Sequence, residues 1–312
     1  MTRRTDADAT GRVEPIRVGP RPRDMTTRGA VRPALAAAVL LGMAACGQPG
    51  AATTVPTATS TATEPATSGL ALRVESTGGF VSPSMTTGRL PLVSVYADGR
   101  VITQGPVAAT YPGPALPNLQ EQRIGPSALR DLVDEALAAG VADTTDLGTP
   151  PIADATSTRF TVVTASHTYV REAYALSETP ADAEGLTGAQ RTARTKLAGL
   201  LDRLSGLSGT GGDSSPYSAS AVAALATPWV DPQDGLAQPD AAWPGPDLPG
   251  EPTGGRPDLT CVTATGDQTT SLLTAAASAN ANTPWVTRDG SRWTVTFRPL
   301  LPDESSCADL QG

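Results

Sequence analysis

The chain has one histidine, His167, and its imidazole is the side chain best suited to acid–base catalysis near neutral pH. It lies in "TASHTYV", near the expected turn of a β-hairpin. A catalytic base needs a nucleophile within reach and a third group that orients it. The sequence contains no Gly-x-Ser-x-Gly, Ser-x-x-Lys or His-Glu-x-x-His motif that would supply them. We therefore expect His167 to be an exposed turn residue, and we predict no catalytic residue.

Carboxylates are the next source of chemistry. Asp143, Asp146 and Asp154 fall in one expected loop, "ADTTDLGTPPIADAT". Three acidic side chains could hold Ca²⁺, but the regular spacing and the bidentate Glu of a calcium loop are absent. They are the best metal candidates in a chain for which we predict no metal site and no cofactor. Alternatively, Asp146 and Asp154 could serve as the acid and base of a hydrolase.

Cys261 and Cys307 are expected to form a disulfide if the chain is exported. Closing a loop of about 45 residues would stabilise the fold by roughly 4 kcal/mol on the chain-entropy estimate. The alternative is a metal site, but two thiols and one histidine cannot complete a tetrahedral ligand set without carboxylates. The sequence therefore favours the disulfide.

All four tryptophans lie in the C-terminal half of the chain. They could fill the core of a small second unit, because a tryptophan ring buries a large apolar area. They could instead form a surface for a protein partner, since tryptophan is enriched at interface hot spots. Trp229, Trp243 and Trp285 are the candidates for such a surface.

The N-terminal region has the features of an export signal. Arg28 and Arg32 precede a short apolar run, "ALAAAVLLGMAA", which is too short to span a bilayer and is followed by Cys46. We assign residues 1–45 to a signal peptide, with Met25 as an alternative start of translation. "LGMAAC" resembles the lipobox of bacterial lipoproteins, and this resemblance implies that Cys46 is lipidated, for example with palmitate, and anchors the chain to the membrane.

Elsewhere the chain resembles uncharacterised lipoproteins of actinobacteria, through "YADGR", "YPGPALP" and "FRPLLPDE". This second resemblance implies no activity.

Residues 46–68 are expected to form a disordered stalk rich in Thr, Ala and Pro, because they offer almost no large apolar side chain to bury. The net charge of −8 argues against a nucleic-acid partner, whose phosphates require a basic surface. The sequence then divides into an α+β body over residues 69–207, a Gly/Ser linker over 208–216 and a smaller α+β half over 217–312.

Within the body, alternating strands and amphipathic helices predict an α+β fold. Asp98-Gly99 indicates a hairpin turn. A second hairpin is expected from Phe160 to Leu176, and apolar spacing predicts helices within residues 125–140 and 187–207. Because the strands alternate between apolar and polar residues, we expect antiparallel sheets with helices packed on one face.

In the second half, a Pro-rich stretch over residues 231–258 is expected to have no regular structure. A strand, a helix and an Asp-Gly hairpin should follow it. The stretch contains "WPGPDLP", a near copy of "YPGPALP" at residues 111–117. Neither copy has a nucleophile or a base, so we interpret both as rigid extended segments pinned to the body by their aromatic and Leu side chains.

Together these features predict an exported, membrane-anchored lipoprotein that is a non-catalytic binding or structural component of the cell envelope. Its partners would be the membrane, through the lipid, and an envelope protein or polysaccharide. Two alternatives remain open. One is an inhibitor or regulator of a secreted enzyme, and the other is an envelope hydrolase that uses carboxylates alone.

Overall fold

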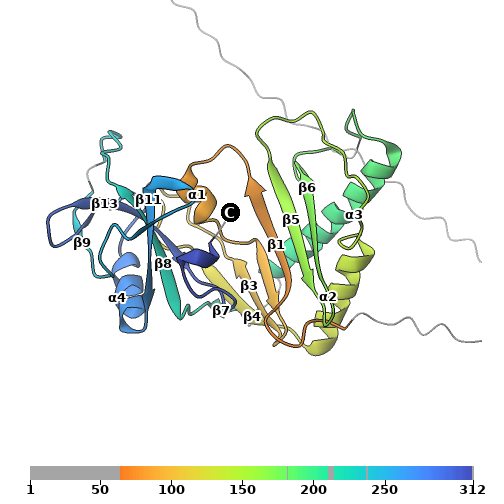
Figure 1. Ribbon diagram of the computed structural model, residues 1–312, viewed down its shortest axis with the longest axis horizontal. Coiled ribbons are helices and arrows are strands. Elements are labelled where there is room, and N and C mark those ends of the chain that lie inside the picture. The colour runs from red at the N-terminus through yellow and green to blue at the C-terminus, as the bar shows by residue number, and fades with distance from the viewer. Residues whose placement is uncertain (1–63, 181, 210–213, 237, 311–312) are drawn as a thin grey trace, which may run out of the picture. The chain divides into compact units, whose positions relative to one another are not determined.

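A computed structural model describes residues 64–180, 182–209, 214–236 and 238–310 of the chain. They form two β-sheets and four α-helices (Figure 1). All strand pairs are antiparallel except that of β9 with β12. The predicted α+β class with antiparallel sheets is confirmed. The expected signal peptide, Cys46 and the stalk up to residue 63 lie outside the described residues.

The first sheet has seven strands in the order β6-β5-β1-β2-β3-β4-β7. Their bounds are β1 Leu70–Gly78, β2 Val93–Tyr96, β3 Arg100–Gln104, β4 Leu119–Arg123, β5 Thr156–Val163, β6 Thr168–Tyr174 and β7 Ser215–Pro216. β1 is a central strand, paired with β2 on one side and β5 on the other. Pro65, in the expected stalk, already bridges Thr164 just beyond β5, so the ordered chain enters this sheet before β1.

Helices α2 (Pro126–Ala138) and α3 (Gly188–Ser205) cover one face of the seven-stranded sheet (Figure 1). Pro126 occupies the first turn of α2, and Thr187 with Gln190 forms a capping box at the start of α3. The predicted apolar stripes are buried against the sheet: they comprise Leu129, Leu132, Val133 and Ala136 from α2, and Leu197, Leu200 and Leu204 from α3. A short 3₁₀-helix, η1 (Gly206–Gly209), follows α3.

The second sheet has six strands in the order β10-β11-β8-β13-β12-β9. Their bounds are β8 Ala221–Pro228, β9 Ala241–Ala242, β10 Glu251–Thr253, β11 Arg256–Thr265, β12 Trp285–Val286 and β13 Arg292–Pro299. Helix α4 (Asp267–Ala276) packs on one face of this sheet through Leu272 and Ala276. Trp285 and Phe297 meet edge to face beneath it, with ring centroids 5.4 Å apart.

The stretch from 231 to 258 differs from its prediction, because β9, β10 and the first residues of β11 belong to the sheet. Pro252 is compatible with β10 because this strand is an edge of the sheet, where a missing N–H breaks no central ladder. Pro257 precedes the residues of β11 that pair with β8. The Pro-rich copies also converge. Leu116 of the first copy and Trp243 and Leu248 of the second pack against the same cluster as Trp285.

The C-terminal segment from Leu300 to Leu310 lies between the two sheets. Leu300 and Leu310 join an apolar cluster on the face of the second sheet opposite α4, together with Leu225 and Cys261. Leu301 instead joins a cluster on the face of the first sheet opposite α2 and α3. The layers are therefore helices, first sheet, C-terminal segment, second sheet and α4, and Figure 1 shows the last described residues, in dark blue, between the sheets.

Ionic contacts fix this segment to both sheets. The guanidinium of Arg298, on β13, donates to both carboxylate oxygens of Glu304 at 3.0 and 2.8 Å, and the two side chains are only 3% and 8% exposed. Arg73, on β1, donates to Asp303 at 2.8 Å, and the Tyr96 hydroxyl donates to the same oxygen at 2.8 Å. Burial and the Asp303 charge raise the pKa of Tyr96, so this phenol remains a donor.

Replacing Glu304 with alanine should lower the free energy of unfolding by about 3 kcal/mol, because Arg298 would be left buried without its anion. Urea denaturation monitored by tryptophan fluorescence measures this change. Asp258→Ala is the matched control, because it also removes a carboxylate paired with an arginine, but in an exposed pair. The control should barely change stability. Equal effects of the two variants would contradict the role assigned to Glu304.

Candidate functional site

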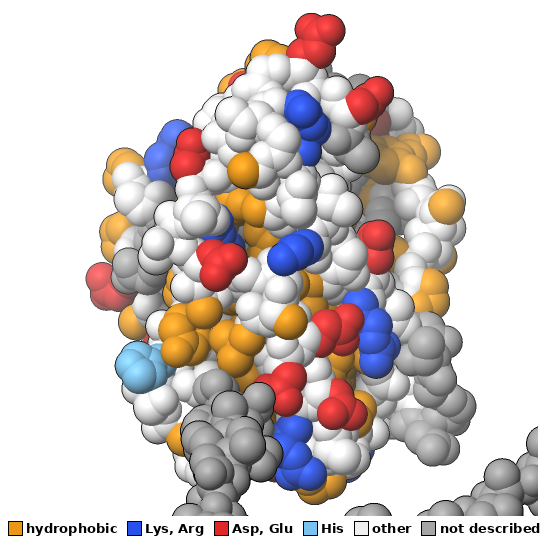
Figure 2. Space-filling model, turned by 90° about the vertical axis from the view of Figure 1, so that its right-hand side faces the viewer, with side chains coloured by type: hydrophobic (Ala, Val, Ile, Leu, Met, Phe, Trp, Pro, Cys, Tyr) orange, Lys and Arg blue, Asp and Glu red, His pale blue; other side chains and the backbone are white. Residues whose placement is uncertain are grey.

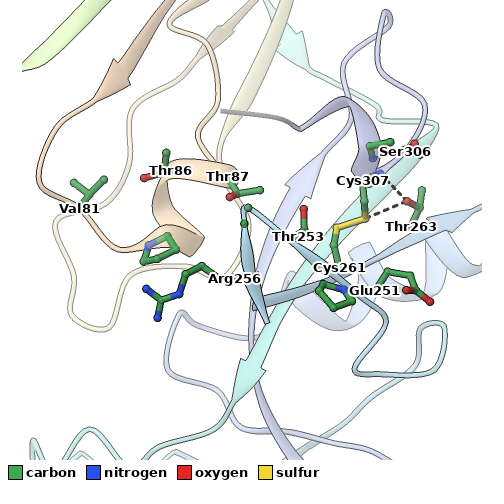
Figure 3. A pocket seen from close by; sticks show the side chains of 15 residues that line it. Val81, Thr86, Thr87, Glu251, Thr253, Arg256, Cys261, Thr263, Ser306 and Cys307 are labelled. Carbon is green, nitrogen blue, oxygen red and sulfur yellow. Dashed lines mark hydrogen bonds between the residues drawn. A yellow bond between two sulfur atoms is a disulfide. The ribbon is translucent and has the colours of Figure 1, made fainter. Parts of the chain in front are cut away.

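A cleft of about 870 Å³ opens beside the C-terminal segment (Figure 3). Three elements line it: the short helix α1 (Pro83–Thr87), the β10–β11 hairpin, and the 3₁₀-helix η2 (Cys307–Asp309) with the residue before it. These elements come from the first strand connection of the chain and from its last residues. The volume is within the usual range of small-molecule sites.

Local sequence explains how the walls of the cleft form. Ser82 caps α1, accepting a hydrogen bond from the Met85 N–H, and Pro83 occupies the first helical turn. The turn between β10 and β11 consists of Gly254 and Gly255, both with positive φ. A Cβ on Gly254 would lie 2.6 Å from the Thr87 hydroxyl, so only glycine lets the hairpin approach α1 this closely.

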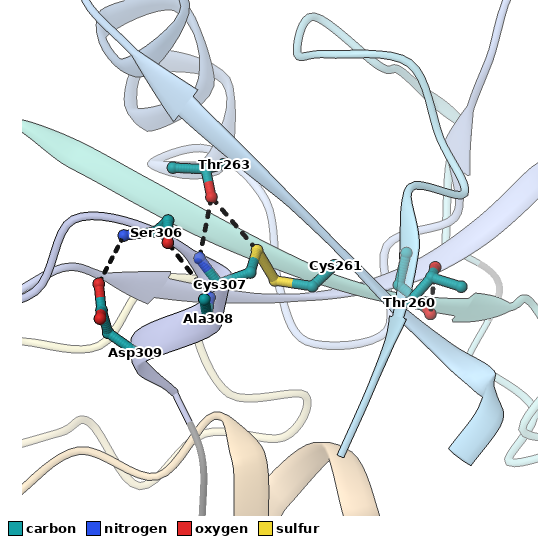
Figure 4. The surroundings of a disulfide bond; sticks show 8 residues. Thr260, Cys261, Thr263, Ser306, Cys307, Ala308 and Asp309 are labelled. Atoms are coloured by element: carbon teal, nitrogen blue, oxygen red, sulfur yellow. Dashed lines mark hydrogen bonds between the residues drawn. A yellow bond between two sulfur atoms is a disulfide. The ribbon is translucent and has the colours of Figure 1, made fainter. Parts of the chain in front are cut away.

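The disulfide between Cys261 and Cys307 lines one wall of the cleft (Figure 4). The predicted cysteine pair is therefore confirmed. The Thr263 hydroxyl donates to Cys307 Sγ at 3.3 Å and accepts from the Cys307 N–H at 3.0 Å. Asp309 accepts from the N–H groups of Ser305 and Ser306, which caps the start of η2.

Hydroxyl groups dominate the polar chemistry of the cleft. Its polar side chains are those of Thr86, Thr87, Thr253, Thr263, Ser306, Glu251 and Arg256. Glu251 is the one carboxylate among them, and Arg256 is held by two hydrogen bonds to Asp258. No histidine lies among the lining residues. This set can bind a polar ligand through hydrogen bonds, but it offers no base with an orienting partner for a hydroxyl nucleophile.

The threonines of α1 and the β10–β11 hairpin carry no motif that predicts a site. The Gly-Gly pair at 254–255 was an available signal for a close backbone approach. The cysteine pair predicted that two distant segments meet, but no pattern in the sequence indicated that α1 would join them.

His167 lies on the surface at the β5–β6 turn, as expected (Figure 2). Its ring stacks on Tyr169 with centroids 5.7 Å apart, and its Nδ1 lies 2.8 Å from the Ser166 hydroxyl. No salt bridge joins it to a carboxylate among the described residues. In the view of Figure 2, acidic and basic side chains are interspersed, so this face presents no broad surface of one charge.

The aspartates proposed as a metal site are not brought together. Within residues 64–310, gaps excepted, no three His, Cys, Asp or Glu side chains form a group that could hold a metal ion. Asp146 is engaged structurally, accepting from the Gly148 N–H and from the Gln190 side-chain amide, both at 2.9 Å. Asp143 lines a separate pocket beside α3, and Asp154 adopts a positive φ in the loop before β5.

Of the three tryptophans considered as candidates for a partner surface, two fill the core instead. Trp285 is 1% exposed, and Trp243 packs against it in the core under α4. Both rings are used for core filling, since the second sheet has few other large apolar side chains. Trp229 differs, because it lines a pocket of its own with Arg292 at the far end of β8.

Comparisons of the chain with protein-family models, with curated proteins and with solved structures each found no match. In the part of the chain that the structure describes, no helix is both long and apolar enough to cross a bilayer. The lipidation predicted for Cys46 concerns a residue outside that part.

Replacing both Cys261 and Cys307 with serine should lower the free energy of unfolding by about 4 kcal/mol, because the disulfide joins residues 46 positions apart. Urea denaturation with and without dithiothreitol measures this. The reductant should destabilise the unaltered chain to the level of the variant and leave the variant unchanged. If the unaltered chain loses no stability on reduction, the disulfide does not hold η2 in place.

Proposed function

We propose that the chain is an exported lipoprotein, anchored to the membrane through Cys46, whose body binds a component of the cell envelope without chemically altering it. The apolar run before Cys46 and the "LGMAAC" sequence support export and lipidation. The disulfide supports an extracytoplasmic location, because such bonds persist in oxidising compartments.

The observation that carries the binding function is the cleft between α1, the β10–β11 hairpin and η2. It combines a ligand-sized volume with convergent hydroxyls and the rigid walls described above. Glu251 has no second carboxylate beside it among the lining residues, which disfavours a two-carboxylate hydrolase at this site. The polar lining favours a hydrophilic ligand over a lipid.

Intact mass of the chain from its own kind of host tests the anchor. We expect a mature form that starts at Cys46, carries acyl chains and is two hydrogens lighter because of the disulfide. Cys46→Ser should abolish acylation, whereas the matched Cys261→Ser/Cys307→Ser variant should remain acylated. Globomycin should block maturation of the unaltered chain. A freely secreted chain without acyl mass would refute the anchor and favour a secreted regulator of another enzyme.

Filling the cleft tests the binding function. Ala308 lines the cleft from η2 and is exposed, so Ala308→Trp should obstruct it. Native mass spectrometry of the chain extracted from envelopes should detect a bound small molecule that this variant loses. Ala142→Trp is the matched control, because it places the same ring on an exposed alanine outside the cleft. A bound species retained equally by both variants would contradict binding in the cleft.

A further inference from the structure

A second pocket, of about 480 Å³, lies at the end of β8 and shares no lining residue with the cleft. Its walls are Trp229, loop residues 231–236 with Gln238 and Asp240, Asn282 with Pro284, and Arg292. This pocket contributes no residue to the cleft or to the proposed lipid anchor, so it could have a function of its own. We call it the Trp229 pocket.

The aromatic side chain of this pocket is held in place. The Arg292 guanidinium lies over the Trp229 ring, 5.4 Å from its centroid, and donates to Asp240 at 2.6 Å. The backbone N–H of Trp229 also donates to the backbone carbonyl of Arg292 at 3.0 Å. The Arg292 guanidinium, which is paired with Asp240, thus covers one face of the Trp229 ring. A ligand can contact only the uncovered part of the indole.

A polar wall is assembled from three distant parts of the chain. The Tyr111 hydroxyl donates to Asp234 at 2.8 Å, and the Asn282 side-chain amide lies 3.4 Å from the same oxygen. The Leu236 N–H donates to the other oxygen of Asp234 at 2.9 Å. Hydrogen bonds from Leu236 and Tyr111 hold the pKa of Asp234 below its usual range. These groups are therefore oriented before any ligand arrives.

The carboxylate oxygens of the pocket that accept no hydrogen bond from the described residues remain available to a ligand as acceptors. Among the hydrogen bonds of the described residues, Asp231 uses one oxygen, to the Gln233 N–H, and Asp240 uses one oxygen, to Arg292. The second oxygen of each carboxylate is open. A fitting ligand must then supply several O–H or N–H donors. An anionic ligand would be repelled by the three carboxylates, and an apolar ligand would leave them without partners.

Apolar side chains surround these acceptors. Val230 is 77% exposed, Leu236 is 45% exposed and Tyr111 is 68% exposed. Leu236 lines the pocket, Tyr111 reaches it through its hydrogen bond to Asp234, and Val230 lies between Trp229 and Asp231 in the chain. A ligand that carries hydroxyl donors on its edge and C–H groups on its faces would satisfy both parts of the pocket. A pyranose ring has this combination.

We propose that the Trp229 pocket binds a neutral saccharide, with the uncovered part of the Trp229 ring against the sugar face and the open oxygens of Asp231 and Asp240 accepting its hydroxyls. The site takes a short stretch of a glycan chain, since the pocket is open to solvent at the sheet edge. It would hold the body against envelope polysaccharide independently of whatever the cleft binds.

Saturation-transfer NMR on the full chain in a sugar-free zwitterionic detergent tests this. The probes are cellotetraose, maltotetraose and the tetramer of N-acetylglucosamine, each at millimolar concentration, with spermidine as a cationic probe. At least one oligosaccharide should bind. Trp229→Ala should weaken that binding by about tenfold or more, because it removes the stacking surface. Asp231→Asn should weaken it severalfold, since it preserves the cap on Gln233 but replaces an open acceptor with a donor.

Two matched controls remove similar groups elsewhere. Phe80→Ala removes an aromatic ring that is 90% exposed, and Asp247→Asn neutralises an exposed carboxylate outside the pocket. Both should bind as the unaltered chain does. If Trp229→Ala does not fold, as judged by circular dichroism, the Asp231→Asn comparison decides. Failure of all three oligosaccharides to bind, binding that is unchanged in the variants, or displacement of the sugar by spermidine would each overturn the proposal.

Discussion

The buried ion pair between Arg298 and Glu304 is the constraint on which the two-sheet arrangement depends. A guanidinium that is 3% exposed is tolerated only when its charge is matched, and Glu304 provides the matching carboxylate. Glu304 also accepts from the Leu301 N–H at 2.7 Å, so it fixes the turn that directs Leu300 and Leu301 to different sheets. Arg298 in turn reaches the Arg89 carbonyl just after α1. One pair of charges thus connects the last strand, the C-terminal segment and the first strand connection.

The cleft exists because this C-terminal segment only partly fills the space between the sheets. Leu310 and Cys307 cover the second sheet near Cys261, and the disulfide holds them there. Beyond Cys307, α1 and the β10–β11 hairpin extend past the segment, and the uncovered face between them is the cleft. The same residues therefore stabilise the fold and shape the site, so changes in η2 should affect both.

The sequence predicted the local elements better than their assembly. Asp98-Gly99 and the apolar stripe from Leu129 to Ala136 act through near neighbours, so their patterns are visible in the sequence. The position of the C-terminal segment was not predicted, because Arg298 and Glu304 look like ordinary surface charges until tertiary contacts bury them. No strand was predicted in residues 231–258 because of their prolines. A proline is nevertheless tolerated in an edge strand such as β10. The aspartate loop failed as a site because short-range turns use Asp146.

The way the chain enters the first sheet determines how the body would bear a mechanical load. Any pull transmitted through the residues before Glu64 reaches the body at Pro65 and then runs along β1. Because β1 pairs with β2 over Leu70–Val74 and with β5 over Leu72–Gly78, a pull along β1 would load hydrogen bonds of both ladders. An edge strand in the same position would detach progressively at low force. The central placement of β1 therefore spreads a load that enters the body at Pro65 over two neighbouring strands.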